Sequence, residues 1–123
     1  MNNRKNGALE QLENLNIERG KLFSDFPYFE RKDACYYSNA AAGELGELCN
    51  MLKKFLREKE VGGKAFDKDG TEITPYTICL EAADVIIYLE FFTAIFGLSL
   101  SELLRYKFNE VSHKKNCDLL IEK

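Results

Sequence analysis

The chain of 123 residues is 46% hydrophobic and 30% charged, and it contains only two prolines. Such a length and mixture predict one compact domain over residues 1–123 and exclude a disordered or fibrous protein. The formal net charge of -3 also argues against a protein whose main role is to bind duplex nucleic acid, because clustered Lys and Arg are typical of such proteins.

The N-terminal segment MNNRKNGALEQLENLN has no apolar region of the kind that a secretory signal contains. The four cysteines lie far apart and form no CxxC pair, which is typical of reduced core thiols. His113 is the lone histidine and does not complete a tetrahedral zinc site with them. These features predict a cytoplasmic protein.

Helical periodicity dominates the chain, and residues typical of helix ends separate the periodic segments. A first helix is expected over residues 8–22, followed by the aromatic stretch LFSDFPYF, which Pro27 interrupts. A second helix is expected to begin near its N-cap Asp33 and to run until the glycine pair Gly62-Gly63 stops it.

After this glycine pair, the segment KAFDKDGTEIT contains the tight-turn signal Asp69-Gly70. This signal predicts either a small β-hairpin or an ordered loop. A third helix is expected from the cap Thr74 and the first-turn residue Pro75 to Gly97, because proline is favoured at helix starts and glycine at helix ends.

A fourth helix follows at once, because Ser99 and Glu102 have the spacing of a capping box. Its apolar face consists of Leu100, Leu103, Leu104, Phe108 and Val111. Together the segments predict an all-α fold, a bundle of about four helices. Since a few long helices often need a partner to cover their faces, the core is expected to be completed by oligomerisation.

The third helical segment is apolar nearly all round, which is typical of a buried helix. A membrane span is the alternative, but residues 78–100 carry Glu81, Asp84 and Glu90. Each acid at the centre of a membrane costs about 3 kcal/mol on insertion scales. The sequence therefore predicts a helix buried in the protein core and not a membrane span.

Two pairs of carboxylates lie on helical surfaces that are otherwise apolar. On the second helix, Glu44 falls within an apolar arc and Glu47 lies roughly 60° away at its edge. The arc is formed by Leu45, Leu48, Met51, Leu52, Phe55 and Leu56. On the third helix, Glu81 and Asp84 stand one turn apart on a surface with little polar area. Because burial of an unpaired carboxylate costs several kcal/mol, the four acids need a common positive partner.

A divalent cation is the expected partner of these acids. Oxygen ligands favour Mg²⁺, or Mn²⁺, over zinc or copper, and no Glu-x-x-His pair indicates a di-iron bundle. The simpler interpretation is that each acid is a helix-surface residue paired with Lys or Arg, and a single ExxE motif would favour it. Two matched pairs in apolar surroundings instead predict the metal ligands Glu44, Glu47, Glu81 and Asp84.

Lysines near the apolar faces are candidates for phosphate binding. Lys54 lies two turns beyond Glu47 on the same edge of the second helix. Lys107 falls among apolar residues of the fourth helix. Either a bound anion such as polyphosphate, or the reach of its long side chain to water, explains that position.

The segments GELGELCNMLKKF, EAADVIIYL and LSELLRYKFNEVSHK resemble the successive blocks of MazG-like nucleotide pyrophosphohydrolases. The resemblance covers the second to the fourth helix. The ExxE of one family helix and the ExxD of the next coincide with Glu44, Glu47, Glu81 and Asp84.

This resemblance implies an all-α fold whose dimer or tetramer builds helical bundles. It implies Mg²⁺-dependent cleavage of nucleoside triphosphates, chiefly dNTPs, to the monophosphate and pyrophosphate. Lys107 matches a lysine that family members direct at the phosphates, and Asn109 lies in the same matching block, KFNEVS. A carboxylate not fully engaged by the metal, Glu44 or Glu47, is the expected catalytic base.

Two alternatives stay open at this point. One is a base-specific dUTPase or dCTPase of the same all-α superfamily, and the other is a non-catalytic helical assembly module that binds metal. The chain also departs from the family pattern, because residues 57–76 form a long connection and Val111 replaces a frequent asparagine. This connection is expected either to cover the site or to serve assembly.

Overall fold

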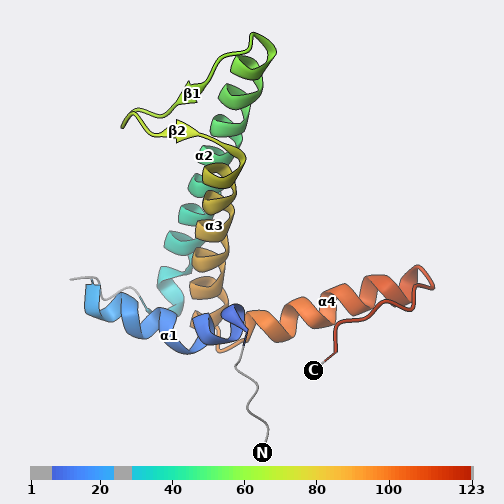
Figure 1. The fold of residues 1–123 in the computed structure, drawn as a ribbon. Helices are drawn as coiled ribbons and strands as arrows, with labels where there is room; N and C mark the ends of the chain where they lie inside the picture. The colour runs from blue at the N-terminus through green and yellow to red at the C-terminus, as the bar shows by residue number, and fades with distance from the viewer. Residues whose placement is uncertain (1–6, 24–28, 123) are drawn as a thin grey trace, which may run out of the picture. The chain divides into compact units, whose positions relative to one another are not determined.

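The computed structural model describes residues 7–23 and 29–122, which form four α-helices and one two-stranded sheet (Figure 1). In chain order the elements are α1 (Ala8–Phe23), the 3-10 turn η1 (Arg31–Asp33), α2 (Ala34–Glu60), β1 (Ala65–Phe66), β2 (Glu72–Ile73), α3 (Pro75–Ile95) and α4 (Leu100–Lys114). The predicted all-α fold is confirmed. The interruption expected at Pro27 lies outside the described residues.

Both ends of α3 are formed by the capping residues that the sequence indicated. The Thr74 hydroxyl accepts a hydrogen bond from the Thr77 backbone N–H at 3.2 Å. At the other end, Gly97 adopts a φ of 72°, and the N–H of Leu98 donates to the carbonyl of Thr93 at 3.1 Å. This left-handed conformation favours glycine, so the helix stops where the sequence predicts.

The start of α2 differs from the prediction that Asp33 is its N-cap. Asp33 is the last residue of η1, and its carboxylate accepts a hydrogen bond from the Glu30 N–H at 3.0 Å. The Asp33 N–H in turn donates to the Glu30 carbonyl at 2.8 Å. Asp33 therefore caps the 3-10 turn that precedes α2. Short polar side chains of this kind can cap turns as well as α-helices.

The connection between α2 and α3 is a β-hairpin, which decides between the two predicted alternatives. Its strands pair antiparallel, with Ala65 opposite Ile73. At its tip, one carboxylate oxygen of Asp67 accepts hydrogen bonds from the backbone N–H groups of Asp69 and Thr71, both at 2.9 Å. The Asp67 side chain therefore stabilises the turn, because its oxygen accepts these N–H groups in place of a backbone carbonyl.

Contacts divide the chain into two compact units. Unit 2 is Cys35–Leu89, which contains the hairpin, nearly all of α2 and most of α3, and unit 1 is the remainder of the chain. In unit 2, α2 and α3 run side by side in opposite directions (Figure 1). The core of this unit joins the hairpin to both helices and consists of Ala65, Ile73 and Ile78 with Leu48, Met51 and Phe55 against them.

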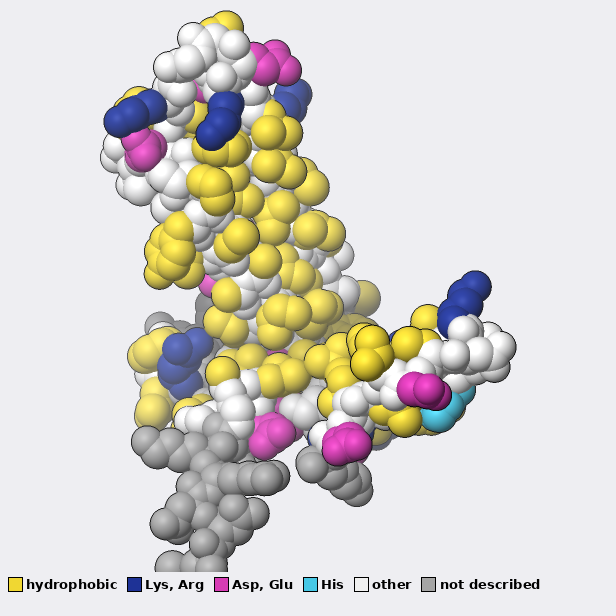
Figure 2. Space-filling view, turned by 45° about the vertical axis from the view of Figure 1, so that its right-hand side comes forward, with side chains coloured by type: hydrophobic (Ala, Val, Ile, Leu, Met, Phe, Trp, Pro, Cys, Tyr) yellow, Lys and Arg dark blue, Asp and Glu magenta, His cyan; other side chains and the backbone are white. Residues whose placement is uncertain are grey.

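The prediction that α3 is buried is wrong for the chain by itself. Leu80 of α3 is 48% exposed and Ile86 is 43% exposed. Half of the apolar arc of α2 is likewise open, with Leu45 50%, Leu52 41% and Leu56 52% exposed. One neighbouring helix and a short hairpin cover only one side of each helix, and hydrophobic side chains gather on the face that Figure 2 shows.

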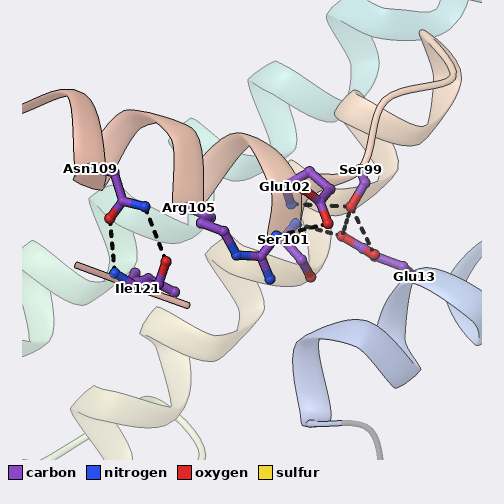
Figure 3. Close-up of polar contacts among 7 residues, drawn as sticks. All are labelled: Glu13, Ser99, Ser101, Glu102, Arg105, Asn109 and Ile121. Atoms are coloured by element: carbon purple, nitrogen blue, oxygen red, sulfur yellow. Dashed lines mark hydrogen bonds and ion pairs between the residues drawn. The ribbon is translucent and has the colours of Figure 1, made fainter. Parts of the chain in front are cut away.

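In unit 1, one acid of α1 meets the beginning of α4 (Figure 3). The Glu13 carboxylate accepts hydrogen bonds from the Ser99 hydroxyl at 2.9 Å and from the Ser101 backbone N–H at 2.6 Å. Farther along α4, the Asn109 amide donates to the carbonyl of Ile121 at 3.0 Å and accepts from its N–H at 2.8 Å. Polar contacts therefore tie α1 and the C-terminal segment to α4.

Within the described residues, no single helix combines the length and the hydrophobicity needed to cross a membrane. The consecutive helices α3 and α4 pass that test only when they are counted together. The apolar α3 contains Glu81, Asp84 and Glu90, the three acids that argue against a span in the sequence.

Candidate metal and phosphate site

Helix geometry turns Glu44 toward the core of unit 2. Each residue of an α-helix advances by about 100°, which places Glu44 within roughly 40° of Leu48 and Met51. These two side chains pack against the core that joins α2 to the hairpin and α3. Glu44 is half-buried on this inward face of α2, in agreement with the sequence pattern.

Three of the four predicted metal ligands come together. Glu44 of α2 and both acids of α3, Glu81 and Asp84, each offer a carboxylate oxygen, and these oxygens all lie within 4.8 Å of one another. The two acids of α3 stand one turn apart and therefore face the same side of the helix. A single Mg²⁺ or Mn²⁺ ion suits such a group, because both metals prefer carboxylate oxygens.

The close approach of the acids changes the pKa of Glu81. A side-chain hydrogen bond with Glu44, burial and the negative charges of neighbouring acids together raise the pKa of Glu81 from 4.5 to about 7. Two ionised carboxylates cannot share a hydrogen bond, so this contact favours the protonated form of Glu81. A cation bound between them would relieve the same repulsion.

Among the described residues, none of the four predicted ligands forms an ion pair with Lys or Arg. The simpler interpretation, in which each acid is a surface residue neutralised by a basic neighbour, predicts such pairs. The structure instead turns three of these carboxylates toward one another. Basic neighbours among the described residues therefore do not neutralise these acids, and a metal ion as their shared ligand stays a prediction.

Glu47 lies outside the converging group but lines the same cavity, which has a volume of about 480 Å³. Its exposed side chain stands at the edge of the inward face, where the sequence pattern predicts it. Lys54 also lines this cavity, together with Glu44 and Glu81. Lys54 forms no ion pair with any described residue, so its ammonium group is available to an anion.

The tip of the hairpin forms another wall of this cavity, so part of the long connection at residues 57–76 lies beside the carboxylates. Asp67, Lys68 and Asp69 all line it. The turn signal at Asp69-Gly70 indicates a tight turn but not the place of that turn in space. Its position depends on the packing of β1 and β2 against α2, which involves residues far apart in the sequence.

The other predicted phosphate-binding residues, Lys107 and Asn109, belong to α4 and to unit 1. The Lys107 side chain is 71% exposed, and its ammonium group lies 3.0 Å from the Glu110 carboxylate. Lys114 reaches the same carboxylate at 3.2 Å. Asn109 is engaged by the backbone of Ile121. A phosphate role for Lys107 and Asn109 stays a prediction.

Comparison with known protein families, with characterised proteins and with solved structures found no match for this chain. The resemblance to MazG-like enzymes therefore rests on the sequence blocks alone and stays a prediction. The structure contributes an all-α fold and a cavity in unit 2 in which carboxylates and lysines lie together.

Proposed function

We propose that this protein is a magnesium-dependent nucleoside triphosphate pyrophosphohydrolase, with dNTPs as its main substrates and the monophosphate and pyrophosphate as products. The observation that carries the proposal is the meeting of Glu44, Glu81 and Asp84 within 4.8 Å. Lys54 lines the cavity beside them. Phosphoryl transfer depends mainly on positioning and on the neutralisation of phosphate charge, and this combination of groups supplies both.

The donor set fits Mg²⁺, with Mn²⁺ as the alternative. The three converging ligands offer only carboxylate oxygens, which are the hard ligands that these ions prefer. Glu44, Glu81 and Asp84 would hold the ion, and Glu47 lines the cavity next to them. When bound, Mg²⁺ would offset the charge of the phosphate oxygens and lower the pKa of a coordinated water.

Residues of the chain supply the other parts of the reaction. Glu47 lies outside the converging group, so its carboxylate is the better placed of the two predicted bases to take a proton from the attacking water. That water attacks phosphorus in line with the bond that breaks, and pyrophosphate leaves with the bridging oxygen. Lys54 would hold the leaving pyrophosphate through charge-assisted hydrogen bonds.

The exposed apolar side of unit 2 supports a homodimer or tetramer. Leu45, Leu52 and Leu56 fall within about 40° of one another around α2. Each is between 41% and 52% exposed. A second copy that presents the same face would remove these side chains from water and complete a helical bundle.

A panel of dNTPs and NTPs incubated with Mg²⁺, with pyrophosphate and orthophosphate measured separately, tests the proposed function. We expect pyrophosphate from several dNTPs and none when the metal is chelated. Cleavage of dUTP or dCTP alone would identify the base-specific alternative. Metal binding without any turnover would identify the non-catalytic assembly module.

A further inference from the structure

The hairpin tip brings a second lysine to the cavity that holds the carboxylates. One carboxylate oxygen of Asp67 accepts the backbone N–H groups of Asp69 and Thr71 at 2.9 Å each, and this fixes the shape of the tip. Lys68, which follows Asp67 in the chain, lines the cavity. In the described part of the chain Lys68 forms no ion pair, so its ammonium group is free to meet an anion there.

The charges that line this cavity are unbalanced. They are five carboxylates and two ammonium groups, those of Glu44, Glu47, Asp67, Asp69, Glu81, Lys54 and Lys68. This excess of negative charge repels a free polyphosphate, whereas an Mg²⁺ ion held by the carboxylates would offset part of the charge and attract phosphate oxygens locally. Lysines from two different elements then face the phosphate oxygens that the metal leaves uncovered.

We propose that Lys68 binds phosphate, and that the hairpin tip makes the cavity select polyphosphates over monophosphates. The inference rests on the proposed function. Because Lys54 belongs to α2 and Lys68 to the hairpin, several linked phosphates contact both lysines together with the metal at the carboxylates. A single phosphate reaches fewer of these groups, so the monophosphate product is bound more weakly and leaves.

Calorimetric titration of the full chain with inorganic tripolyphosphate in the presence of Mg²⁺ tests this role. Lys68→Ala is expected to weaken binding about tenfold, which is the loss of one charge-assisted contact. Lys68→Arg keeps the charge and is expected to retain the affinity. Mg²⁺ alone is expected to bind Lys68→Ala as it binds the wild type, because Lys68 is not a metal ligand.

Lys64 offers a matched control on the same hairpin. It pairs with Glu72 at 3.4 Å and lines a different cavity. Lys64→Ala is expected to bind Mg²⁺ and tripolyphosphate as the wild type does. Unchanged affinity in Lys68→Ala, or an equal loss in Lys64→Ala, would overturn the inference.

Steady-state kinetics separate this inference from the proposed function. Lys68→Ala is expected to raise KM for a dNTP about tenfold with kcat nearly unchanged. If Lys68→Ala turns over a dNTP with the wild-type kcat and KM, the role of Lys68 is refuted and the proposed function stands. If tripolyphosphate binding depends on Lys68 but no dNTP is cleaved, the proposed function is refuted and the role of Lys68 stands. A wild-type chain that does not bind tripolyphosphate with Mg²⁺ refutes both.

Discussion

Glu44 and Glu81 lie close enough to share a hydrogen bond, and this contact contributes most to the raised pKa of Glu81. Within one helix, an acid can avoid its neighbour by turning its side chain to water. Here α2 and α3 hold the two acids on facing surfaces, so the repulsion is built into unit 2. Such repulsion is tolerable where a cation is bound, which is the physical basis of the proposed site.

Glu81→Gln tests this basis at a single residue. The amide keeps a hydrogen bond to Glu44 but removes one negative ligand, so Mg²⁺-dependent release of pyrophosphate is expected to fall at least about a hundredfold. Thermal unfolding without metal is expected at the same temperature as in the wild type or higher, because charge repulsion is relieved. Glu60→Gln, at the end of α2 and outside the cavity, is the control. Turnover at the wild-type rate in Glu81→Gln would show that Glu81 is not part of the catalytic site.

Glu90 is a second acid in an unusual place, with only 1% of its surface exposed. Burial raises its pKa, and the charge of Glu13 adds to this, while a hydrogen bond from the side-chain amide of Asn16 opposes it. One of its carboxyl oxygens, Oε1, has no hydrogen-bond partner among the described residues. The folded chain therefore favours the protonated, neutral form of this side chain.

The stability of the fold is expected to depend on pH through Glu90. Because the folded chain holds this proton more tightly than the unfolded chain, stability falls as pH rises from 4.5, the ordinary glutamate pKa, through the raised value. Glu90→Gln removes that loss, so it is expected to be more stable than the wild type at neutral pH and to converge with it near about pH 4. Urea unfolding across this pH range measures the difference. A gap that widens toward acid would show that the sign is wrong.

At the scale of elements, α4 depends on an acid from another helix. Ser99 is its N-cap and accepts a hydrogen bond from the Glu102 N–H at 3.2 Å. The Glu13 carboxylate of α1 adds a partner for the Ser101 N–H, which the first turn of a helix otherwise leaves unpaired (Figure 3). Its negative charge also suits the positive end of the helix dipole.

Glu13→Ala is expected to lower the free energy of unfolding by about 1–2 kcal/mol, because it removes both the acceptor and the charge at the start of α4. Glu18→Ala, at an exposed position of the same helix, is expected to change it by less than about 0.5 kcal/mol. Chemical denaturation of the two variants at one pH gives the comparison. Equal effects would show that the contact of Glu13 with α4 contributes nothing specific.

At the scale of the whole molecule, the amount of apolar surface left open is the main feature. In the described part of the chain only Tyr37, Ala41, Ala65, Ile73 and Ile78 are buried hydrophobic residues. Soluble proteins rarely leave large contiguous apolar patches open, and such patches commonly mark interfaces. The leucines on the open side of α2 are the first candidates for an interface between copies.

Leu52→Glu tests assembly through this side of α2. The wild type is expected to sediment as a dimer or tetramer, and Leu52→Glu is expected to shift it toward the monomer, because association would bury an unpaired charge. Val61→Glu is the control, since Val61 follows α2 and is 79% exposed. Analytical ultracentrifugation at several concentrations measures the shift. A wild type that is monomeric at every concentration would contradict the proposed oligomer.

Much of the candidate site follows from sequence because it depends on spacing within a helix. The interval between Glu81 and Asp84 places both acids on one side of α3 whatever the rest of the chain does. The position of Glu44 relative to Leu48 and Met51 is fixed in the same way. The sequence indicates a long connection that either covers the site or serves assembly. It does not reveal that Lys68 lines the cavity, because this depends on the packing of β1 and β2 on α2.

The sequence by itself determined the helices and most of their ends, because capping at residues such as Thr74 and Gly97 acts between near neighbours. It also determined which acids share a helix face. Only the tertiary structure decided that Glu47 stays outside the group formed by Glu44, Glu81 and Asp84, and that α3 keeps an open side. These outcomes depend on contacts between distant segments, and a local pattern carries no information about which distant surface will cover it.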